Sequence, residues 1–478
     1  MNDLSIFEKT WYEAGKSVPK GVWQRLLACG SEQGMASFES GRVSRYEIAS
    51  SLRLHALRCS KKGKAWYSRE AYFEDFSCLS LLGREAEHLF SPLEDQGDLR
   101  MESEKIASER DDAWKSGYDA ELSEGLSALI FHRLWRSVRD LFKKGIVFDG
   151  YVSWSNGRSG WDGSPLPFAW SDGRQTTFSP LPRLDEKLAF YCEGSAFRRR
   201  SLACSSGSME PVPDYSELCE ELLRLDKSPC VSMTPSNVDA VILSPNAALE
   251  LLAELLPCFR DDAASHLLFS QVFPKQEEPI SAASGIRILC DALFPLFRHR
   301  HAPLDARGKR TQSVTLYEHG RPVQLVSSDA PPRLSQAVIA NPVLERIRRD
   351  LRPNGHAVDP SGKTAIFYPV MLSTMSASLP PYDRALIGKT AERTLVVESL
   401  RMIRTGDSGG RAFLYVPAGG VLYVDGAAFG YVQPFRAEIS LASLLRSLAV
   451  ISSSEWCCGA GVCALSLEPS HLFERLFL

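Results

Sequence analysis

Residues 239–258 read DAVILSPNAALELLAELLPC, and this stretch decides the fold because it predicts a buried strand that turns directly into a helix. The apolar run 241–243 is the expected strand. Ser244 is suited to cap the helix, and Pro245 fits the first turn, where a missing N–H has no helical partner to lose. Apolar residues then recur at helical spacing at Leu249, Leu252, Ala253 and Leu256.

The predicted helix presents no group that could do chemistry on its apolar face. Its acidic residues, Glu250 and Glu254, share the opposite face. A strand that leads into a helix is a common place to build a site, so a well-marked element without reactive residues needs an explanation.

The composition is that of a globular protein with more than one core. The chain has 478 residues, of which 44% are hydrophobic and 24% charged, and its net charge is −3. This balance argues against binding to nucleic acid or to an acidic membrane. Short basic runs at 198–200, 298–300 and 346–349 are interpreted as solvated faces.

Cysteine usage and the terminal sequence predict a cytoplasmic location. The 12 cysteines are scattered without a CxxC pair, which is typical of free thiols in a reducing compartment. The first residues form neither a signal peptide nor a membrane span, and no run of about 18 apolar residues occurs.

The pattern along the chain predicts an α+β fold with two regions. Residues 1–232 form a mixed α/β region, with a possible boundary near 94–112, and residues 233–478 form a β-rich domain with antiparallel sheets and a few helices. The expected elements are two strands within 35–60, helices at 68–90, 121–145 and 216–228, β structure at 147–180, a hairpin turning at His319–Gly320, strands broken at Gly419, Gly420 and Gly426, and a helix within 440–452.

The segment TGDSGGRAF at 405–413 resembles the nucleophile loop of trypsin-like proteases, in which Ser408 would attack and the glycines would form an oxyanion hole. The required histidine loop is missing upstream, so a glycine-rich turn is the preferred interpretation. A stand-alone hydrolase that uses Ser408 or a C-terminal cysteine as its nucleophile remains the alternative function.

The sequence also contains candidate metal ligands and candidate reactive thiols. No histidine is followed by glutamate, so the HExxH pattern of zinc peptidases is absent. His299 and His301 are interpreted as surface residues, and His132 as a packed or surface residue. The cluster EWCCGAGVC contains Cys457, Cys458 and Cys463, which could act as ligands or nucleophiles but are expected to be buried, inert thiols. Trp154, Trp161 and Trp170 are expected to pack within β-hairpins rather than bind sugar.

The order of several motifs resembles that of the TldD/PmbA family, also called the modulator-of-gyrase family. Residues 302–324, APLDARGKRTQSVTLYEHGRPVQ, are similar to the family's LDxxGxxTxxxxLxxxG hairpin. The family's helix entrance corresponds to Glu438, Ile439, Leu441, Ala442 and Leu445, and its closing cysteine-glycine strand to CCGAGVCALSLEP. The strand pair at 38–68 also matches, so the resemblance spans nearly the whole chain.

The resemblance implies an answer to the question of the blank helix. In TldD-type subunits this helix carries HExxxH and a C-terminal cysteine completes a zinc site, whereas PmbA- or TldE-type subunits lack the ligands. Here Leu249, Glu250 and Leu251 stand in the ligand region, and Cys458 would lack its histidine partners. The chain therefore resembles the PmbA/TldE branch.

The implied function is that of a non-catalytic subunit of a zinc-dependent peptidase. The expected partner is a homologue that bears HExxxH and the zinc, and no catalytic, cofactor-binding or metal-binding residue is assigned to this chain. Flexible peptides would bind by adding a strand to an exposed edge. The unusual CCGAGVC cluster favours a specialised role such as leader-peptide removal or maturation of a modified peptide. A peptide-binding scaffold without proteolytic activity is a further alternative.

Overall fold

The computed structural model describes a large part of the chain in two packed regions. The described residues are 22–60, 65–68, 71–73, 90–92, 126–163, 175–178, 183–194, 199–206, 215–232, 237–273, 285–292, 305, 311–328, 341–356, 365, 367–374, 379–404, 411–417, 419–457, 460–472 and 475–477.

A long hairpin begins the structure. Strand β1 (Val22–Glu39) pairs antiparallel with β2 (Arg42–Ser60), as the alternation within 35–60 predicts, and the register shifts once, at a bulge at Ser44. Ser40 and Gly41 form the turn, and both have positive φ, 48° and 71°. Such a turn matches the natural twist of the paired strands. The turn is held by the Gly41 N–H, which donates to the Phe148 carbonyl at 2.7 Å.

This hairpin belongs to a nine-stranded sheet with the order β5-β3-β2-β1-β6-β8-β9, in which β4 pairs with β2 and β7 with β6. The remaining strands are β3 (Ala65–Ser68), β4 (Ala71–Phe73), β5 (Phe90–Pro92), β6 (Ile146–Gly163), β7 (Gln175–Phe178), β8 (Arg183–Cys192) and β9 (Arg199–Ser206).

The helix expected to begin near Ser68 is wrong at its start. Residues 71–73 form β4 instead, which pairs with 52–54 of β2. The sequence Ala-Tyr-Phe contains two aromatic residues that suit a strand, and the neighbouring edge of β2 supplies their backbone hydrogen bonds.

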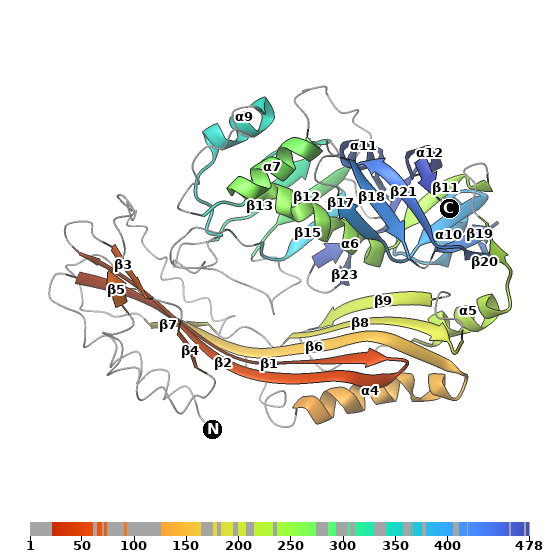
Figure 1. Cartoon of the computed structure of the whole chain (residues 1–478), viewed down its shortest axis with the longest axis horizontal. Coiled ribbons are helices and arrows are strands. Elements are labelled where there is room, and N and C mark those ends of the chain that lie inside the picture. The colour runs from red at the N-terminus through yellow and green to blue at the C-terminus, as the bar shows by residue number, and fades with distance from the viewer. Residues whose placement is uncertain are drawn as a thin grey trace.

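Helix α4 (Leu126–Phe142) covers one face of the sheet, beneath β1, β2 and β6 in Figure 1. It ends near Gly145, which has a φ of 74°, as predicted. The buried side of α4 packs on an aromatic cluster in the sheet: the ring centroids of Phe38 and Phe148 lie 5.3 Å apart, and those of Phe148 and Phe190 5.8 Å apart.

The C-terminal half lies above this sheet in Figure 1 and contains three further sheets. Their strand orders are β10-β20-β19-β16-β11-β25-β22, β14-β13-β12-β15-β24-β23 and β17-β18-β21-β26. The first sheet consists of β10 (Cys230–Val231), β11 (Ala240–Leu243), β16 (Arg393–Val397), β19 (Val421–Val424), β20 (Ala427–Val432), β22 (Ala449–Val450) and β25 (Leu465–Leu467).

The six-stranded sheet contains β12 (Ile286–Cys290), β13 (Val314–Glu318), β14 (Arg321–Pro322), β15 (Val370–Thr374), β23 (Glu455–Cys457) and β24 (Ala460–Val462). The four-stranded sheet contains β17 (Arg401–Arg404), β18 (Arg411–Val416), β21 (Phe435–Ser440) and β26 (Arg475–Phe477). Described helices in this part of the chain are α5 (Ser216–Asp226), α6 (Pro245–Leu255), η4 (Leu256–Phe259), α7 (Ala263–Val272), α9 (Pro342–Asp350), α10 (Arg384–Thr390), α11 (Leu441–Ser447) and α12 (Pro469–Leu472).

The seven-stranded sheet separates two hydrophobic cores. Val241 and Leu243 of β11 face a core that also contains the apolar side of α6, whereas Ile242 between them faces a second core shared with α4 and α5. Alternation along β11 therefore places α6 on the opposite face of this sheet from α5.

The α+β class and most expected elements are confirmed. The turn at His319–Gly320 has positive φ at both residues, and the strands between 411 and 432 break at the predicted glycines. No described helix is long and apolar enough to cross a membrane. The domain boundary at 232 and 233 stays a prediction, and the possible boundary at 94–112 lies outside the described residues.

Candidate functional site

The strand-to-helix corner in residues 239–258 forms as the sequence predicts. Ser244 is the N-cap of α6, and its Oγ accepts a hydrogen bond from the Ala247 N–H at 3.3 Å. Pro245 occupies the first turn. The side of the helix that includes Leu251 and Leu255 is buried in the larger core. The apolar face predicted from the sequence is therefore partly wrong: of its four residues only Leu252 is buried, and Ala253 is exposed. The α6 helix is therefore fixed by its cap and by its packing.

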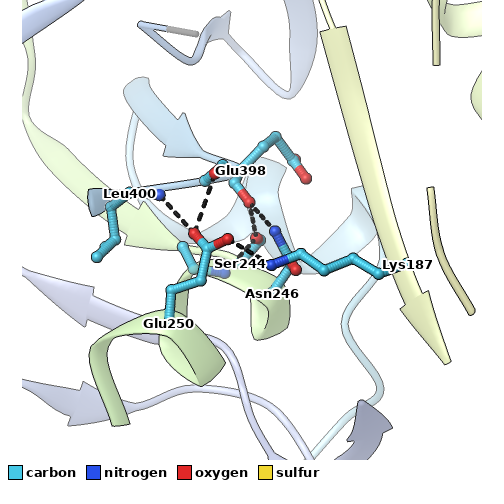
Figure 2. Close-up of polar contacts among 8 residues, drawn as sticks. Lys187, Ser244, Asn246, Glu250, Glu398 and Leu400 are labelled. Carbon is cyan, nitrogen blue, oxygen red and sulfur yellow. Dashed lines mark hydrogen bonds and ion pairs between the residues drawn. The ribbon is translucent and has the colours of Figure 1, made fainter. Parts of the chain in front are cut away.

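Glu250 extends from α6 toward two other parts of the fold (Figure 2). One carboxylate oxygen lies 2.6 Å from the Lys187 Nζ of β8. The other accepts from the Leu400 N–H at 2.7 Å and from the Ser399 hydroxyl at 3.0 Å. Both side chains of the ion pair are partly buried, with 29% of Lys187 and 20% of Glu250 exposed. Glu250 thus links α6 to the nine-stranded sheet and to the segment that follows β16.

The same segment, 398–400, also binds the first turn of α6. The Asn246 Nδ2 donates to the Glu398 carbonyl at 2.7 Å, and the Ser244 hydroxyl donates to it at 3.3 Å. These contacts converge on one short connection between β16 and β17 (Figure 2). We name the set Lys187, Ser244, Asn246, Glu250 and residues 398–400 the α6 anchor.

The side chain of Glu398 continues this network into a buried charge cluster. Arg200 of β9 lies 2.8 Å from the Glu398 carboxylate and 3.5 Å from that of Glu221 on α5. The Tyr423 hydroxyl donates to Glu221. Arg200 therefore joins the nine-stranded sheet, α5 and the segment 398–400 through one guanidinium group, whose planar geometry suits two carboxylates.

Burial dominates the electrostatics of this cluster. Desolvation raises the pKa of the Glu398 carboxyl, while Arg200 favours its ionised form and Glu221 opposes it. Burial likewise raises the pKa of the Tyr423 and Tyr382 hydroxyls, so both remain protonated at neutral pH. Removal of the guanidinium group or of a carboxylate would leave a buried charge without compensation. The cluster therefore holds the elements that carry these side chains in fixed positions.

The α6 anchor can hold structure but offers little to catalysis. The Glu250 carboxylate is occupied by a cation and two hydrogen-bond donors, so neither oxygen is directed at a substrate. Within the part of the chain that the structure describes, no group of three histidine, cysteine or acidic residues could hold a metal ion. The sequence-based expectation that this chain binds no zinc stays a prediction, because Cys458 lies outside the described residues.

Several of the other candidate residues cannot be placed relative to the α6 anchor, because they fall outside the part of the chain that the structure describes. Ser408, His299, His301 and Trp170 lie outside the described residues. Cys457 ends strand β23, Trp161 lies in β6, and His132 is exposed on α4. Cys463 is fully buried in the larger core, as expected, and Trp154 of β6 is buried in the second core.

The basic runs were interpreted as solvated faces, and for two residues this is wrong. The Arg200 side chain is only 10% exposed and pairs with Glu398 and Glu221. The Arg348 side chain is 9% exposed, and its Nε lies 2.8 Å from Asp261, which also binds His266. A run of arginines gives no sign of which member turns inward, because the acidic partners lie far away in the sequence.

Comparison with known proteins connects this geometry to a fold. No family model and no curated protein matches the sequence. Among solved structures, TldE from Thermococcus kodakarensis matches with a TM-score of 0.64 at 17% identity, over 97% of this chain and 98% of that one. Proposed modulators of DNA gyrase from Thermotoga maritima and Bacteroides thetaiotaomicron match with TM-scores of 0.60 and 0.58 at 13% and 14% identity.

These two matches also cover nearly complete chains: 97% of this chain and 98% of the Thermotoga protein, and 98% of this chain and 97% of the Bacteroides protein. Identities of 13–17% establish the architecture and no more. The chain therefore has the fold of TldE and of the proposed DNA gyrase modulators, the TldD/PmbA fold that its sequence resembles.

Proposed function

We propose that this chain is the zinc-less, non-catalytic subunit of a zinc-dependent peptidase complex. Its partner would be a homologue that carries HExxxH on the helix equivalent to α6. The observation that carries this proposal is the α6 anchor: the polar residues Asn246 and Glu250 of this helix are engaged in contacts with 398–400 and Lys187. In a catalytic subunit the same helix would present ligands and a general base.

In such a complex, this chain would close a chamber between the subunits and would bind the peptide substrate at a strand edge. A flexible peptide gains main-chain hydrogen bonds when it adds to a strand edge, and this recognition depends little on side-chain identity. Removal of a leader peptide or maturation of a modified peptide fits this chemistry. We expect the homologous subunit to dock through the β-rich C-terminal half, and we expect the complex to be cytoplasmic.

Reconstitution tests the proposal. The chain would be purified alone and together with an HExxxH-bearing homologue, and hydrolysis of an unstructured peptide would be measured with and without a chelator. We expect activity only in the mixture, and loss of that activity with chelator. In the partner, replacement of the HExxxH glutamate by Gln should reduce kcat on the order of a thousandfold or more.

Within this chain, a matched pair of variants separates positioning from catalysis. Glu250→Gln should change kcat of the assembled complex only a few fold, comparable to Glu345→Gln on the exposed side of α9. Chelator-resistant hydrolysis by the purified single chain would contradict the proposal. Loss of that hydrolysis in Ser408→Ala would favour the alternative of a serine hydrolase.

A further inference from the structure

A cleft of about 610 Å³ lies between the β13–β14 hairpin and the C-terminal end of α9. Its volume is within the range of about 300–1,000 Å³ that is typical of small-ligand sites. The cleft shares no residue with the α6 anchor. The titratable residues that line it come from both sides: Glu318, His319, Arg321, Arg346, Asp350 and Arg352.

Two arginines in this lining have no acidic partner within the part of the chain that the structure describes. Arg321 of β14 is exposed and takes part in no ion pair there. Arg352, two residues after the end of α9, is also exposed, and the one described acceptor of its guanidinium group is the Leu351 carbonyl at 3.3 Å. Guanidinium groups that line a cleft without a carboxylate partner are available to a ligand.

The carboxylates of the cleft do not neutralise both of these arginines. Glu318 is held by Arg287 of β12, with Oε1 and Nε 3.0 Å apart. Asp350, the last residue of α9, is exposed and forms no ion pair among the described residues. Arg346 already has a contact of its own. The two free arginines and the one free carboxylate therefore sum to a single positive charge, which a monoanion would balance.

The walls of the cleft are fixed before any ligand binds. Asn354 is buried, and its side chain accepts from the Ser327 N–H and donates to the Leu325 carbonyl, both at 2.8 Å. The Gln312 N–H donates to the Asn354 carbonyl at 3.1 Å. Helix α9 is held by the ion pair of its inward-facing Arg348. A site that is already ordered loses little conformational entropy when a ligand binds.

The lining matches the three chemical parts of a peptide C-terminus. Guanidinium groups bind a carboxylate through charge-assisted, often bidentate, hydrogen bonds. The side-chain amides of Gln312 and Gln324 can donate to and accept from a peptide group. Pro322, Val323 and Leu351 supply apolar surface for the last side chain, and Val323 is 37% exposed.

We propose that this cleft binds the free C-terminal carboxylate of a peptide and that Arg321 and Arg352 recognise it. The choice of a peptide over another carboxylic acid rests on the proposed function, in which the chain binds peptides. Binding is measured on the single chain, without the homologue and without zinc. A failure of this proposal is therefore distinct from a failure of the peptidase proposal, which is measured as hydrolysis by the complex.

Titration calorimetry of the purified full chain tests the ligand class. The probe is acetyl-Gly-Ala-Leu with a free carboxylate, and its matched control is the same peptide with a C-terminal amide. The acid should bind with a dissociation constant below about 1 mM, and the amide at least about tenfold more weakly, because it lacks the charge-assisted hydrogen bonds. 4-Methylpentanoate, which keeps the leucine side chain and carboxylate without a peptide group, and inorganic phosphate should each also bind at least about tenfold more weakly than the acid.

Substitutions in the cleft test the residues. Arg321→Gln and Arg352→Gln should each weaken binding of the acid about tenfold and close the gap between acid and amide. Asp350→Asn removes a repelling charge and should strengthen binding of the acid about twofold to threefold. The control Arg349→Gln, in an exposed pair with Glu345 outside the cleft, should leave binding unchanged.

Equal affinity of the acid and the amide for wild type would overturn the proposal, as would no detectable binding of the acid at about 5 mM. A preference for the acid that survives both arginine substitutions would also overturn it, because the carboxylate would then be recognised elsewhere. So would 4-methylpentanoate or phosphate that binds as tightly as the peptide acid, since the cleft would then select another kind of anion.

Discussion

Glu250 shows at the scale of one residue how a polar side chain can fix the position of a helix. Its spacing from Glu254 on the polar side of α6 suggests only a solvated face. In the fold, its carboxylate instead joins Lys187 and the backbone of Leu400, from two elements distant in the sequence. The residue therefore positions α6 relative to both elements.

Replacement of Glu250 should therefore reduce stability more than replacement of an exposed helical glutamate. In Glu250→Ala the Leu400 N–H loses its acceptor and Lys187 its counter-ion, so we expect a loss of about 2–3 kcal/mol in the free energy of unfolding. Glu345→Ala on α9, which removes an exposed pair with Arg349, should cost less than about 1 kcal/mol. Urea unfolding followed by circular dichroism measures both variants. Equal effects would show that Glu250 is not a structural anchor.

At the scale of elements, the helices, strands and turns that the sequence predicts correctly are those determined by interactions between residues close together in the chain. The strand and helix at 239–258, the hairpin turn at His319–Gly320 and the strand pair at 35–60 all follow from periodicity, capping residues and glycines with positive φ. The prediction of a helix that begins near Ser68 was wrong at its first turn, because residues 71–73 pair with the edge of β2 and form a strand. Local pattern carries no information about such pairing.

Contacts between distant elements could not be predicted for the same reason. Arg200, Glu221 and Glu398 come from β9, α5 and the segment after β16, and nothing in the sequence marks them as neighbours. The family resemblance predicted the overall fold. Its implication that α6 carries no zinc ligands stays a prediction. The resemblance did not predict the α6 anchor, whose members come from elements far apart in the sequence.

The charge cluster also makes a prediction about pH. Burial raises the pKa of Glu398 in the folded chain above its value in the unfolded chain, so the folded state binds this proton more tightly. Its contribution to stability is therefore fully present below the unfolded pKa of about 4.3 and is lost as pH rises through the folded pKa.

Comparison of wild type with Glu398→Gln isolates this contribution, since glutamine does not titrate. The free energy of unfolding of wild type minus that of the variant should fall as pH rises from about 4 through the folded pKa of Glu398. Asp140→Asn on α4 is the control. Lys143 lowers the pKa of this exposed carboxyl, so the difference for Asp140→Asn should change little above about pH 4 and should fall as pH drops through the folded pKa of Asp140. A difference for Glu398→Gln that rises with pH would contradict the assignment.

At the scale of the whole molecule, the structure describes a large curved sheet joined to a C-terminal half by α5, the Arg200 cluster and the α6 anchor. This architecture matches TldE over nearly the full length of both chains.

The zinc content of the complex tests the central claim most directly. Elemental analysis would be performed after dialysis on the chain alone and on its 1:1 complex with the HExxxH-bearing homologue. We predict no stoichiometric zinc in the chain alone and one zinc per pair in the complex, retained when Cys458→Ser is introduced in this chain and lost when the HExxxH histidines are replaced. One tightly bound zinc in the isolated chain, lost in Cys458→Ser, would contradict the account.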